Sequence, residues 1–120
     1  MNLLIVDDDH ELRSVLARVS ESYFDEVLAV QTAREALLVI DQQSPHVILT
    51  DWDLNESVSG VDILKYACEV SPKSRQAMIT GKSITKLRQL TSDLYVDFYI
   101  EKPFTISELR TVLQALAEKS

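Results

Sequence analysis

Val47-Ile48-Leu49-Thr50-Asp51 is the stretch that decides the fold, because it is a short apolar run that ends abruptly in an acid. Its length and its β-branched residues predict a buried strand, so Asp51 would lie where the strand leaves the core. Four other polar residues also follow short apolar runs, namely Asp7, Asp8, Thr80 and Lys102. We therefore expect all of these side chains to converge on Asp51.

The composition is that of an ordinary soluble globular protein. The chain has 120 residues, 46% apolar and 26% charged, which suffices for a single domain over residues 1–120 with its own core. The first residues lack a basic and then apolar leader, and no segment is long enough to span a bilayer. The single cysteine, Cys68, fits a reducing compartment, so we expect a cytoplasmic protein without membrane contact.

Charge and glycine content exclude several kinds of ligand. Nineteen acidic against twelve basic residues give a formal net charge of −7, which repels phosphate backbones and anionic lipids. We therefore expect no direct binding of nucleic acid by this chain. Gly60 and Gly81 are the only glycines, so neither a glycine-rich phosphate loop nor a dinucleotide-binding motif is present.

Strand and helix patterns alternate along the chain. Short apolar runs predict strands over Leu3–Val6, Val27–Val30, Val47–Thr50, Gln76–Thr80 and Val96–Ile100. Helical spacing predicts five helices, whose inward positions are Leu12, Val15, Leu16 and Val19, then Ala33, Ala36, Leu37 and Ile40, then Val61, Leu64 and Cys68, then Leu87, Leu90 and Leu94, and finally Leu109, Val112, Leu113 and Leu116. Capping-box pairs precede three of them: Asp8 with Glu11, Thr32 with Glu35, and Thr105 with Glu108.

This alternation predicts an α/β fold, in which a five-stranded parallel sheet is covered by helices on both faces. The first, third and fourth strands are apolar throughout, as central strands should be. Asp97 interrupts the fifth run, which together with Val27–Val30 is an edge candidate. The flavodoxin-like strand order 2-1-3-4-5 satisfies both observations and places a ligand site beyond the carboxyl ends of the first and third strands.

The acids expected at this site repel one another. Three carboxylates about 5 Å apart cost roughly 3 kcal/mol per pair at an effective dielectric constant near 20. The total of about 10 kcal/mol is comparable to the stability of a whole domain, so a proton, a cation or wider spacing must relieve it. A hard divalent cation with oxygen ligands suits the site best, and Mg²⁺ is the abundant candidate. A carboxylate beside such a cation can also act as a nucleophile toward phosphorus.

Four short motifs lie at the expected strand ends, in order along the chain. They are Leu-Ile-Val-Asp7-Asp8, Val-Ile-Leu-Thr-Asp51, Met-Ile-Thr80-Gly81 and Tyr99-Ile-Glu-Lys102-Pro103-Phe104. Together they resemble the receiver domain of bacterial two-component response regulators, from Leu3 to the last helix. The resemblance implies a phosphoacceptor signalling domain rather than an enzyme, with at most self-catalysed phosphorylation and dephosphorylation.

The resemblance also implies how the acids would act. Asp51 would accept a phosphoryl group from a histidine kinase or a histidine phosphotransfer protein. Mg²⁺ would be bound by Asp7 and Asp8, mainly by Asp8 directly, with the Asp51 carboxylate and the backbone carbonyl of Asp53.

By the same similarity, Thr80 and Lys102 would contact the phosphoryl group. Tyr99 would be a switch that turns inward as Thr80 moves toward the phosphate, which alters the surface of the fourth helix, fifth strand and fifth helix. An output domain or effector protein would bind that surface, and a homodimer formed on phosphorylation is a further expected partner. The Lys102-Pro103 bond is expected to be cis.

The loop after the acceptor departs from the family pattern. Asn55 stands where the family usually has proline, and one extra residue separates Asp51 from Gly60. Asp53 would point toward the pocket mouth, where a carboxylate could repel the phosphoryl group or order an attacking water. We hypothesise that Asp53 pairs with Lys82, which follows the fourth strand, and that this pair sets the lifetime of the phosphorylated state.

Two rival functions stay open. Asp51-Trp52-Asp53 resembles the Asp-x-Asp motif of haloacid-dehalogenase-like phosphatases, although those enzymes place this motif on the first strand. A degenerate receiver would bind its partners without phosphorylation, and the presence of all five site residues argues against that. Repeated hydrolysis of a phosphomonoester would favour the phosphatase.

Overall fold

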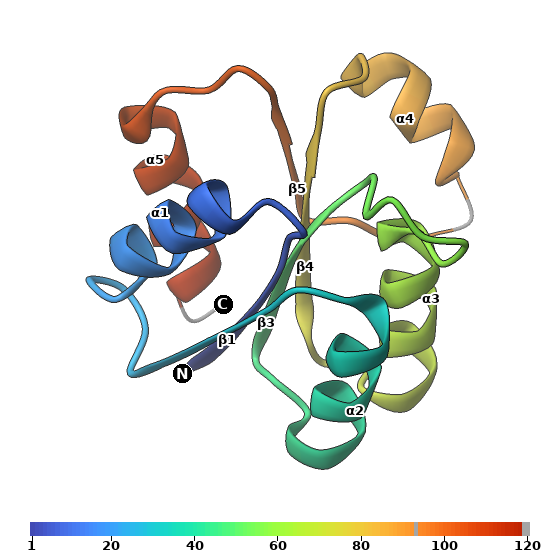
Figure 1. The fold of residues 1–120 in the computed structure, drawn as a ribbon, viewed down its shortest axis with the longest axis horizontal. Coiled ribbons are helices and arrows are strands. Elements are labelled where there is room, and N and C mark those ends of the chain that lie inside the picture. The colour runs from blue at the N-terminus through green and yellow to red at the C-terminus, as the bar shows by residue number, and fades with distance from the viewer. Residues whose placement is uncertain (93, 119–120) are drawn as a thin grey trace.

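The computed structural model describes residues 1–92 and 94–118, in which five strands alternate with five helices (Figure 1). The strands are β1 (Asn2–Val6), β2 (Glu26–Val30), β3 (Val47–Asp51), β4 (Arg75–Thr80) and β5 (Phe98–Glu101). The helices are α1 (His10–Ser20), α2 (Ala33–Gln43), α3 (Gly60–Val70), α4 (Ile84–Leu90) and α5 (Ile106–Ala117).

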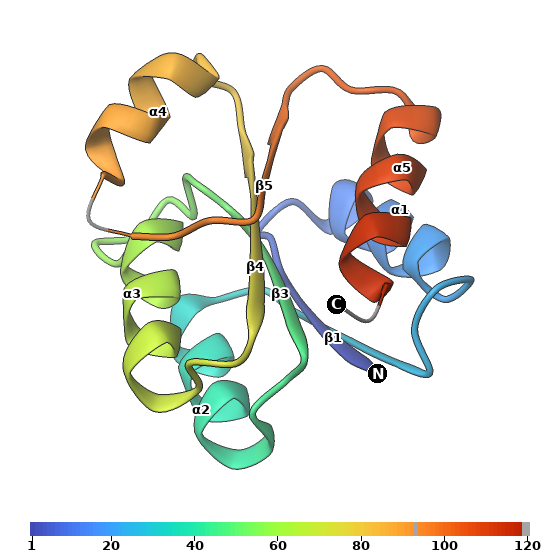
Figure 2. The same cartoon turned by 180° about the vertical axis from the view of Figure 1, so that it is seen from behind.

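The strands form one parallel sheet in the order β2-β1-β3-β4-β5, which confirms the predicted topology. Helices α1 and α5 cover one face of the sheet, while α2, α3 and α4 cover the other (Figures 1 and 2). Strands β2 and β5 lie at the edges, as predicted, and both are partly exposed. No helix in the described part of the chain is long and apolar enough to cross a membrane.

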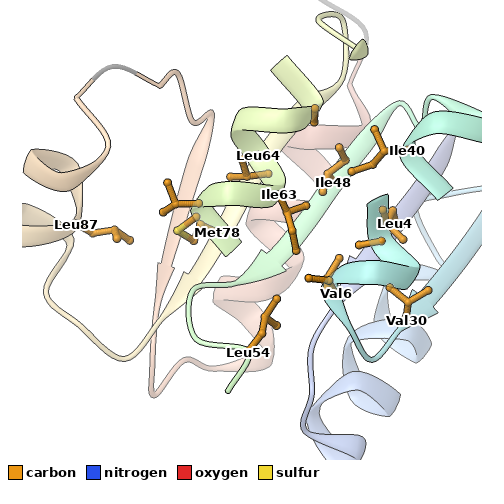
Figure 3. Close-up of a cluster of buried hydrophobic side chains, with 14 residues drawn as sticks. Leu4, Val6, Val30, Ile40, Ile48, Leu54, Ile63, Leu64, Met78 and Leu87 are labelled. Atoms are coloured by element: carbon orange, nitrogen blue, oxygen red, sulfur yellow. The ribbon is translucent and has the colours of Figure 1, made fainter. Parts of the chain in front are cut away.

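Successive residues of the central strands point to opposite faces, so each strand contributes to two cores. On the side of α2 and α3, Leu4 and Ile48 belong to one buried cluster with Ile63 (Figure 3). On the side of α1 and α5, Leu49 belongs to a second cluster with Leu113. Burial on both faces explains why these strands are continuous apolar runs in the sequence.

The start of β5 differs from the prediction. The sequence predicts a strand over Val96–Ile100, whereas β5 spans Phe98–Glu101. The Asp97 N–H donates to the Gln76 carbonyl at 2.8 Å, and the Asp97 carboxylate accepts from the Gln76 N–H at 2.7 Å. Because Asp97 bonds Gln76 through both its backbone and its side chain, the regular ladder between β4 and β5 begins only after it.

Helix α4 is shorter than its apolar spacing predicts. It ends at Leu90, so Leu94 lies beyond it and the prediction that Leu94 faces inward from this helix is wrong. The Thr91 hydroxyl donates to the Leu87 carbonyl at 2.9 Å, a side-chain bond to the backbone that favours the end of a helix. Leu87 is buried as predicted, whereas the side chain of Leu90 is outside the described part of the structure.

Two side chains that the sequence places inward are exposed. Val15 retains 37% of its accessible surface, and Cys68 is also exposed. In α1 the buried stripe runs through Leu16 and Val19, which leaves Val15 at its margin. In α3 the inward position is taken by Ala67, one residue before Cys68.

The start of α1 also corrects a prediction. Its N-cap is Asp9, whose carboxylate accepts two backbone N–H groups at 3.0 and 3.2 Å, so the predicted cap at Asp8 is wrong. The Asp7 carboxylate in turn accepts the Asp9 N–H, which fixes the turn between β1 and α1 and frees Asp8 to line a cavity. Thr32 and Thr105 are N-caps, as predicted.

Candidate functional site

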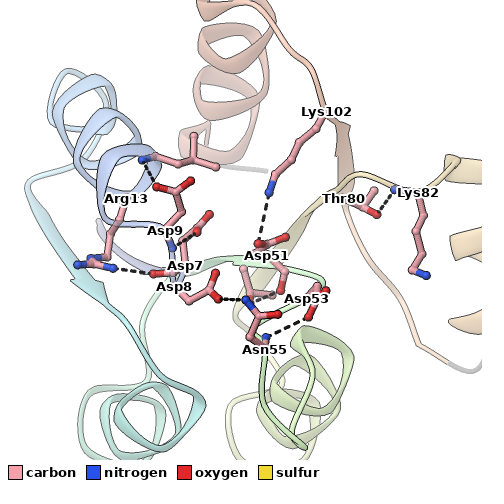
Figure 4. A network of polar contacts seen from close by, with 12 residues as sticks. Asp7, Asp8, Asp9, Arg13, Asp51, Asp53, Asn55, Thr80, Lys82 and Lys102 are labelled. Carbon is pink, nitrogen blue, oxygen red and sulfur yellow. Dashed lines mark hydrogen bonds and ion pairs between the residues drawn. The ribbon is translucent and has the colours of Figure 1, made fainter.

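Three carboxylates meet where β1 and β3 end (Figure 4). Asp7 and Asp8 follow β1, and Asp51 is the last residue of β3. One oxygen from each side chain lies within 4.8 Å of the other two. Asp8 and Asp51 border a surface cavity of about 530 Å³, which Lys102 also lines. The structure thus gathers an all-oxygen donor set beside Lys102.

Asp7 is the most constrained of the three acids. It is fully buried, and its Oδ1 accepts the Asp9 N–H at 2.9 Å. Arg13 donates to the Asp7 backbone carbonyl at 2.9 Å and so does not neutralise the carboxylate. Oδ2 of Asp7 is buried without a hydrogen-bond partner among the described residues. A buried carboxylate oxygen without a donor is costly, and a cation would satisfy it.

Asp51 owes its position to close packing of the backbone around it. The N–H of the next residue, Trp52, donates to the Ile79 carbonyl at 2.8 Å, and Gly60 donates to the Trp52 carbonyl at 3.0 Å. A Cβ at Gly60 would lie 2.1 Å from the Asp51 carbonyl oxygen, so only glycine allows α3 to begin there. The Asp51 carboxylate is therefore held by fixed backbone.

Lys102 approaches Asp51 from β5. Its N–H donates to the Thr80 carbonyl at 2.7 Å, which extends the contact between β4 and β5 by one residue. Its Nζ lies 3.3 Å from Oδ2 of Asp51. The Lys102-Pro103 peptide bond is cis, as expected.

The site carries more negative charge than Lys102 balances. Burial raises the pKa of Asp7 from its ordinary value of 3.8 to about 6, although the hydrogen bond from Asp9 opposes this shift. Burial also raises the pKa of Asp51, and the nearby Lys102 ammonium partly offsets it. Such a cluster favours a shared proton or a bound cation.

The loop after β3 makes a contact that sequence analysis did not predict. Asn55 has a φ of 54°, in the left-handed region, and its side-chain amide donates to Oδ2 of Asp8 at 2.9 Å. The Asp53 carboxylate is exposed and accepts the Asn55 N–H at 3.0 Å. The departure from proline at Asn55 was the signal that this loop differs, because asparagine tolerates left-handed backbone.

Asp53 and Lys82, which we expected to pair, lie at the same cavity without an ion pair between them. Asp53 and Lys82 both line it, yet no salt bridge joins them in the described part of the chain. The Lys82 N–H donates to the hydroxyl of Thr80 at 2.9 Å, and Thr80 is fully buried.

Tyr99 lies on β5 and is half-buried. Its hydroxyl shares a hydrogen bond of 2.8 Å with the Thr91 hydroxyl just after α4. The Arg88 guanidinium stands 5.5 Å from the centre of its ring. Both contacts tie Tyr99 to α4.

Comparison with known proteins identifies the family. The sequence matches the response regulator receiver domain over residues 3–114. It is 29% identical to the phosphate regulon transcriptional regulatory protein PhoB of Pseudomonas aeruginosa, over 98% of this chain and 52% of PhoB. It is 22% identical to the probable chemotaxis protein CheY of Rhizobium etli, over 97% of this chain and 92% of that protein. The receiver domain of NtrX from Brucella abortus has the same fold, with a TM-score of 0.86, 24% identity and coverage of 98% and 99%.

The matches cover nearly all of this chain but only part of some relatives. The family match begins at the second residue of β1 and ends within α5, so it includes the other four strands in full and the acidic cavity. The chain spans about half the length of the curated relatives it matches first. The chain therefore belongs to the response regulator receiver domain family, a family of signalling domains, and it is a receiver domain of a two-component response regulator.

Proposed function

We propose that residues 1–120 form a single receiver domain that accepts a phosphoryl group on Asp51. The observation that carries this proposal is the cluster of Asp7, Asp8 and Asp51, in which Asp8 and Asp51 border a surface cavity that Lys102 also lines, with Nζ of Lys102 3.3 Å from Asp51. Asp8 and Asp51 both border the cavity, and of these two acids it is Asp51 that forms an ion pair with Lys102. A phosphoryl donor could therefore reach it from solvent.

The donor set fits a hard divalent cation. The side chains of Asp7, Asp8 and Asp51 supply oxygen ligands, and the buried Oδ2 of Asp7 lacks any other partner among the described residues. We assign the remaining protein ligand to the backbone carbonyl of Asp53. Mg²⁺ bound there would neutralise charge on the acceptor and on the incoming phosphoryl group.

The transfer step needs little beyond positioning and charge balance. A carboxylate oxygen of Asp51 forms a bond to phosphorus as the bond from phosphorus to a histidine nitrogen of the donor protein breaks, and the imidazole leaves with its electron pair. The Lys102 ammonium binds a phosphoryl oxygen. The Thr80 hydroxyl accepts from the Lys82 N–H, so its own proton stays available for a second phosphoryl oxygen.

Phosphorylation would be transmitted through Thr80 and Tyr99. As Thr80 moves toward the phosphoryl group, Tyr99 exchanges its bond to Thr91 for an inward position, and the surface of α4, β5 and α5 changes. A histidine kinase or histidine phosphotransfer protein is the donor in this scheme. An output domain, an effector protein or a second phosphorylated copy binds the changed surface, and the chain itself contacts neither nucleic acid nor membrane. A single free cysteine supports a cytoplasmic setting.

Trp52, which lines the cavity, provides the test. Mg²⁺ should change its fluorescence, and beryllofluoride or a small phosphodonor should change it further. The Asp51→Asn variant should lose the second change. A folded wild-type protein that shows no second change would support the degenerate receiver, and repeated hydrolysis of a phosphomonoester would support the phosphatase.

We also propose that Asp53 and Lys82 set the lifetime of the phosphorylated state. Both side chains line the cavity, although Asp53 is hydrogen-bonded to the Asn55 N–H rather than paired with Lys82. The dephosphorylation rates of Asp53→Asn and Lys82→Ala test this. Unchanged rates in both variants would refute it.

A further inference from the structure

The loop between β3 and α3 is tied down by two neighbouring side chains. The amide of Asn55 donates to Oδ2 of Asp8 at 2.9 Å, which joins the loop to the end of β1 (Figure 4). Oε2 of Glu56 accepts the N–H of Ala33 at 3.0 Å, which joins the loop to the first residue of α2. The loop is therefore fixed both to the end of β1 and to the start of α2.

The backbone of Asn55 is also fixed. Its φ of 54° lies in the left-handed region, which asparagine tolerates better than most residues. The Asp53 carboxylate accepts its N–H at 3.0 Å and so closes a turn within the loop. Because Asn55 is held through its backbone, its amide is presented to Asp8 at a defined place.

Asp8 is the acid that needs such a partner. Asp7 is fully buried and Asp51 retains 6% of its accessible surface, whereas Asp8 is half-buried at the cavity edge. The bond from Asn55 is the hydrogen bond that the described residues provide to the Asp8 carboxylate. Without it, the side chain would be free to turn into solvent, away from Asp7 and Asp51.

We propose that Asn55 is a positioning residue for the divalent cation, because its amide holds Asp8 in the rotamer that shares the acidic cluster. This inference rests on the proposed function, in which the cluster binds Mg²⁺. Residues that orient metal ligands in this way commonly change metal affinity about 10- to 100-fold when they are replaced. We therefore expect loss of the amide to weaken Mg²⁺ binding about tenfold or more.

Two substitutions separate the amide from the backbone. Asn55→Gly removes the amide but keeps access to left-handed φ, whereas Asn55→Ala removes both. Titration of Trp52 fluorescence with Mg²⁺ gives the affinity, and the shift of the thermal midpoint with added Mg²⁺ gives it independently. Both variants should bind Mg²⁺ about tenfold or more weakly, with Asn55→Ala also less stable without metal.

The outcomes distinguish this inference from the function on which it rests. If Asn55→Gly binds Mg²⁺ as tightly as the wild type, while Mg²⁺ and a phosphodonor both act on the wild type, the positioning role is refuted and the phosphoacceptor function stands. If the folded wild type does not bind Mg²⁺ at all, both are refuted. Glu56→Gln, which retains an oxygen acceptor for the Ala33 N–H, is the matched control and should bind Mg²⁺ like the wild type.

Discussion

The two ends of the sheet treat their polar groups in opposite ways. At the amino ends of the strands, the polar groups bond one another. The imidazole of His46 accepts the Asn2 N–H at 3.0 Å, and a guanidinium nitrogen of Arg75 lies 3.0 Å from the carbonyls of Ala115 and Leu116 in α5. At the carboxyl ends, like charges are gathered and Oδ2 of Asp7 is left without a partner among the described residues.

This difference separates structural from functional polarity. Polar groups that satisfy one another stabilise the fold and leave nothing for a ligand. A buried cluster of acids costs stability, so it is expected where a bound cation or a reaction compensates for the cost. The buried hydroxyl of Ser20 also lacks a hydrogen-bond partner within residues 1–92 and 94–118, but burying a neutral hydroxyl costs far less than burying a carboxylate. Changes at one end should therefore alter ligand binding, and changes at the other should alter stability alone.

The largest effect should follow removal of a carboxylate at the functional end. Replacing a residue that only supports a metal ligand lowers metal affinity by up to roughly a hundredfold. Asp8→Ala removes a ligand itself, so it should lower the affinity for Mg²⁺ by more than that. Asp25→Ala is the matched change at the amino ends, where Asp25 pairs with the terminal amine of Met1. Its Mg²⁺ affinity should equal that of the wild type. Equal affinities in both variants, measured by fluorescence titration, would contradict the comparison.

The pH dependence of stability should reveal the cost of burying the charged Asp7 carboxylate. The pKa of Asp7 is about 6 in the folded protein, above the ordinary 3.8. Between these two pH values, the folded state therefore holds a proton that the unfolded chain has released. In metal-free solution, stability should therefore fall as pH rises from about 4 to 6. The loss amounts to about 3 kcal/mol above this range.

Asp7→Asn should remove that part of the pH dependence. In urea unfolding with a chelator, the variant should be more stable than the wild type at neutral pH and should lose this advantage at pH values below the carboxyl's ordinary pKa. Saturating Mg²⁺ should reverse the order at neutral pH, because the wild type then gains binding energy. A difference in stability between the two proteins that does not vary with pH would contradict this cost of burying the charged carboxylate.

Two glycines at the functional end should respond differently to alanine. A Cβ at Gly60 would lie 2.1 Å from the Asp51 carbonyl oxygen, whereas one at Gly81 would meet nothing within 4 Å. Gly60→Ala should therefore cost about 1–3 kcal/mol or more of unfolding free energy and displace Asp51. Gly81→Ala should stay within about 0.5 kcal/mol of the wild type. Equal stability of the two variants in urea would argue against the close approach of α3.

A modest effect, on stability alone, should come from the amino ends of the strands. Arg75→Ala removes the hydrogen bonds to the last carbonyls of α5 and should cost about 1 kcal/mol of stability. Its Mg²⁺ affinity should be unchanged, since Arg75 lies at the opposite strand end from Asp51. A marked change in affinity would show that the two ends are coupled.

The topology was predictable because burial on two faces is written directly into the sequence. Strands β1, β3 and β4 are apolar at successive positions, which only a central strand needs. The helix starts at Thr32 and Thr105 were also predictable, since their caps involve residues three positions apart. Local and periodic signals of this kind survive without any knowledge of the partner elements.

Other features depend on contacts between distant residues. The late start of β5 follows from the two hydrogen bonds between Asp97 and Gln76, and the exposure of Cys68 depends on how α3 is rotated against the sheet. The bond from Asn55 to Asp8 joins residues 47 positions apart and requires one particular loop conformation. Composition and spacing do not specify such contacts, so the acids were predictable while their support was not.

The most direct test of the central claim is to locate the phosphoryl group. The wild-type protein is incubated with a small phosphodonor in Mg²⁺ or in a chelator, and the adduct is mapped by peptide mass spectrometry. We expect one phosphoryl group, on Asp51, formed in Mg²⁺ and not in the chelator. A folded protein that stays unmodified in Mg²⁺, or one that carries the group on another residue, would contradict it.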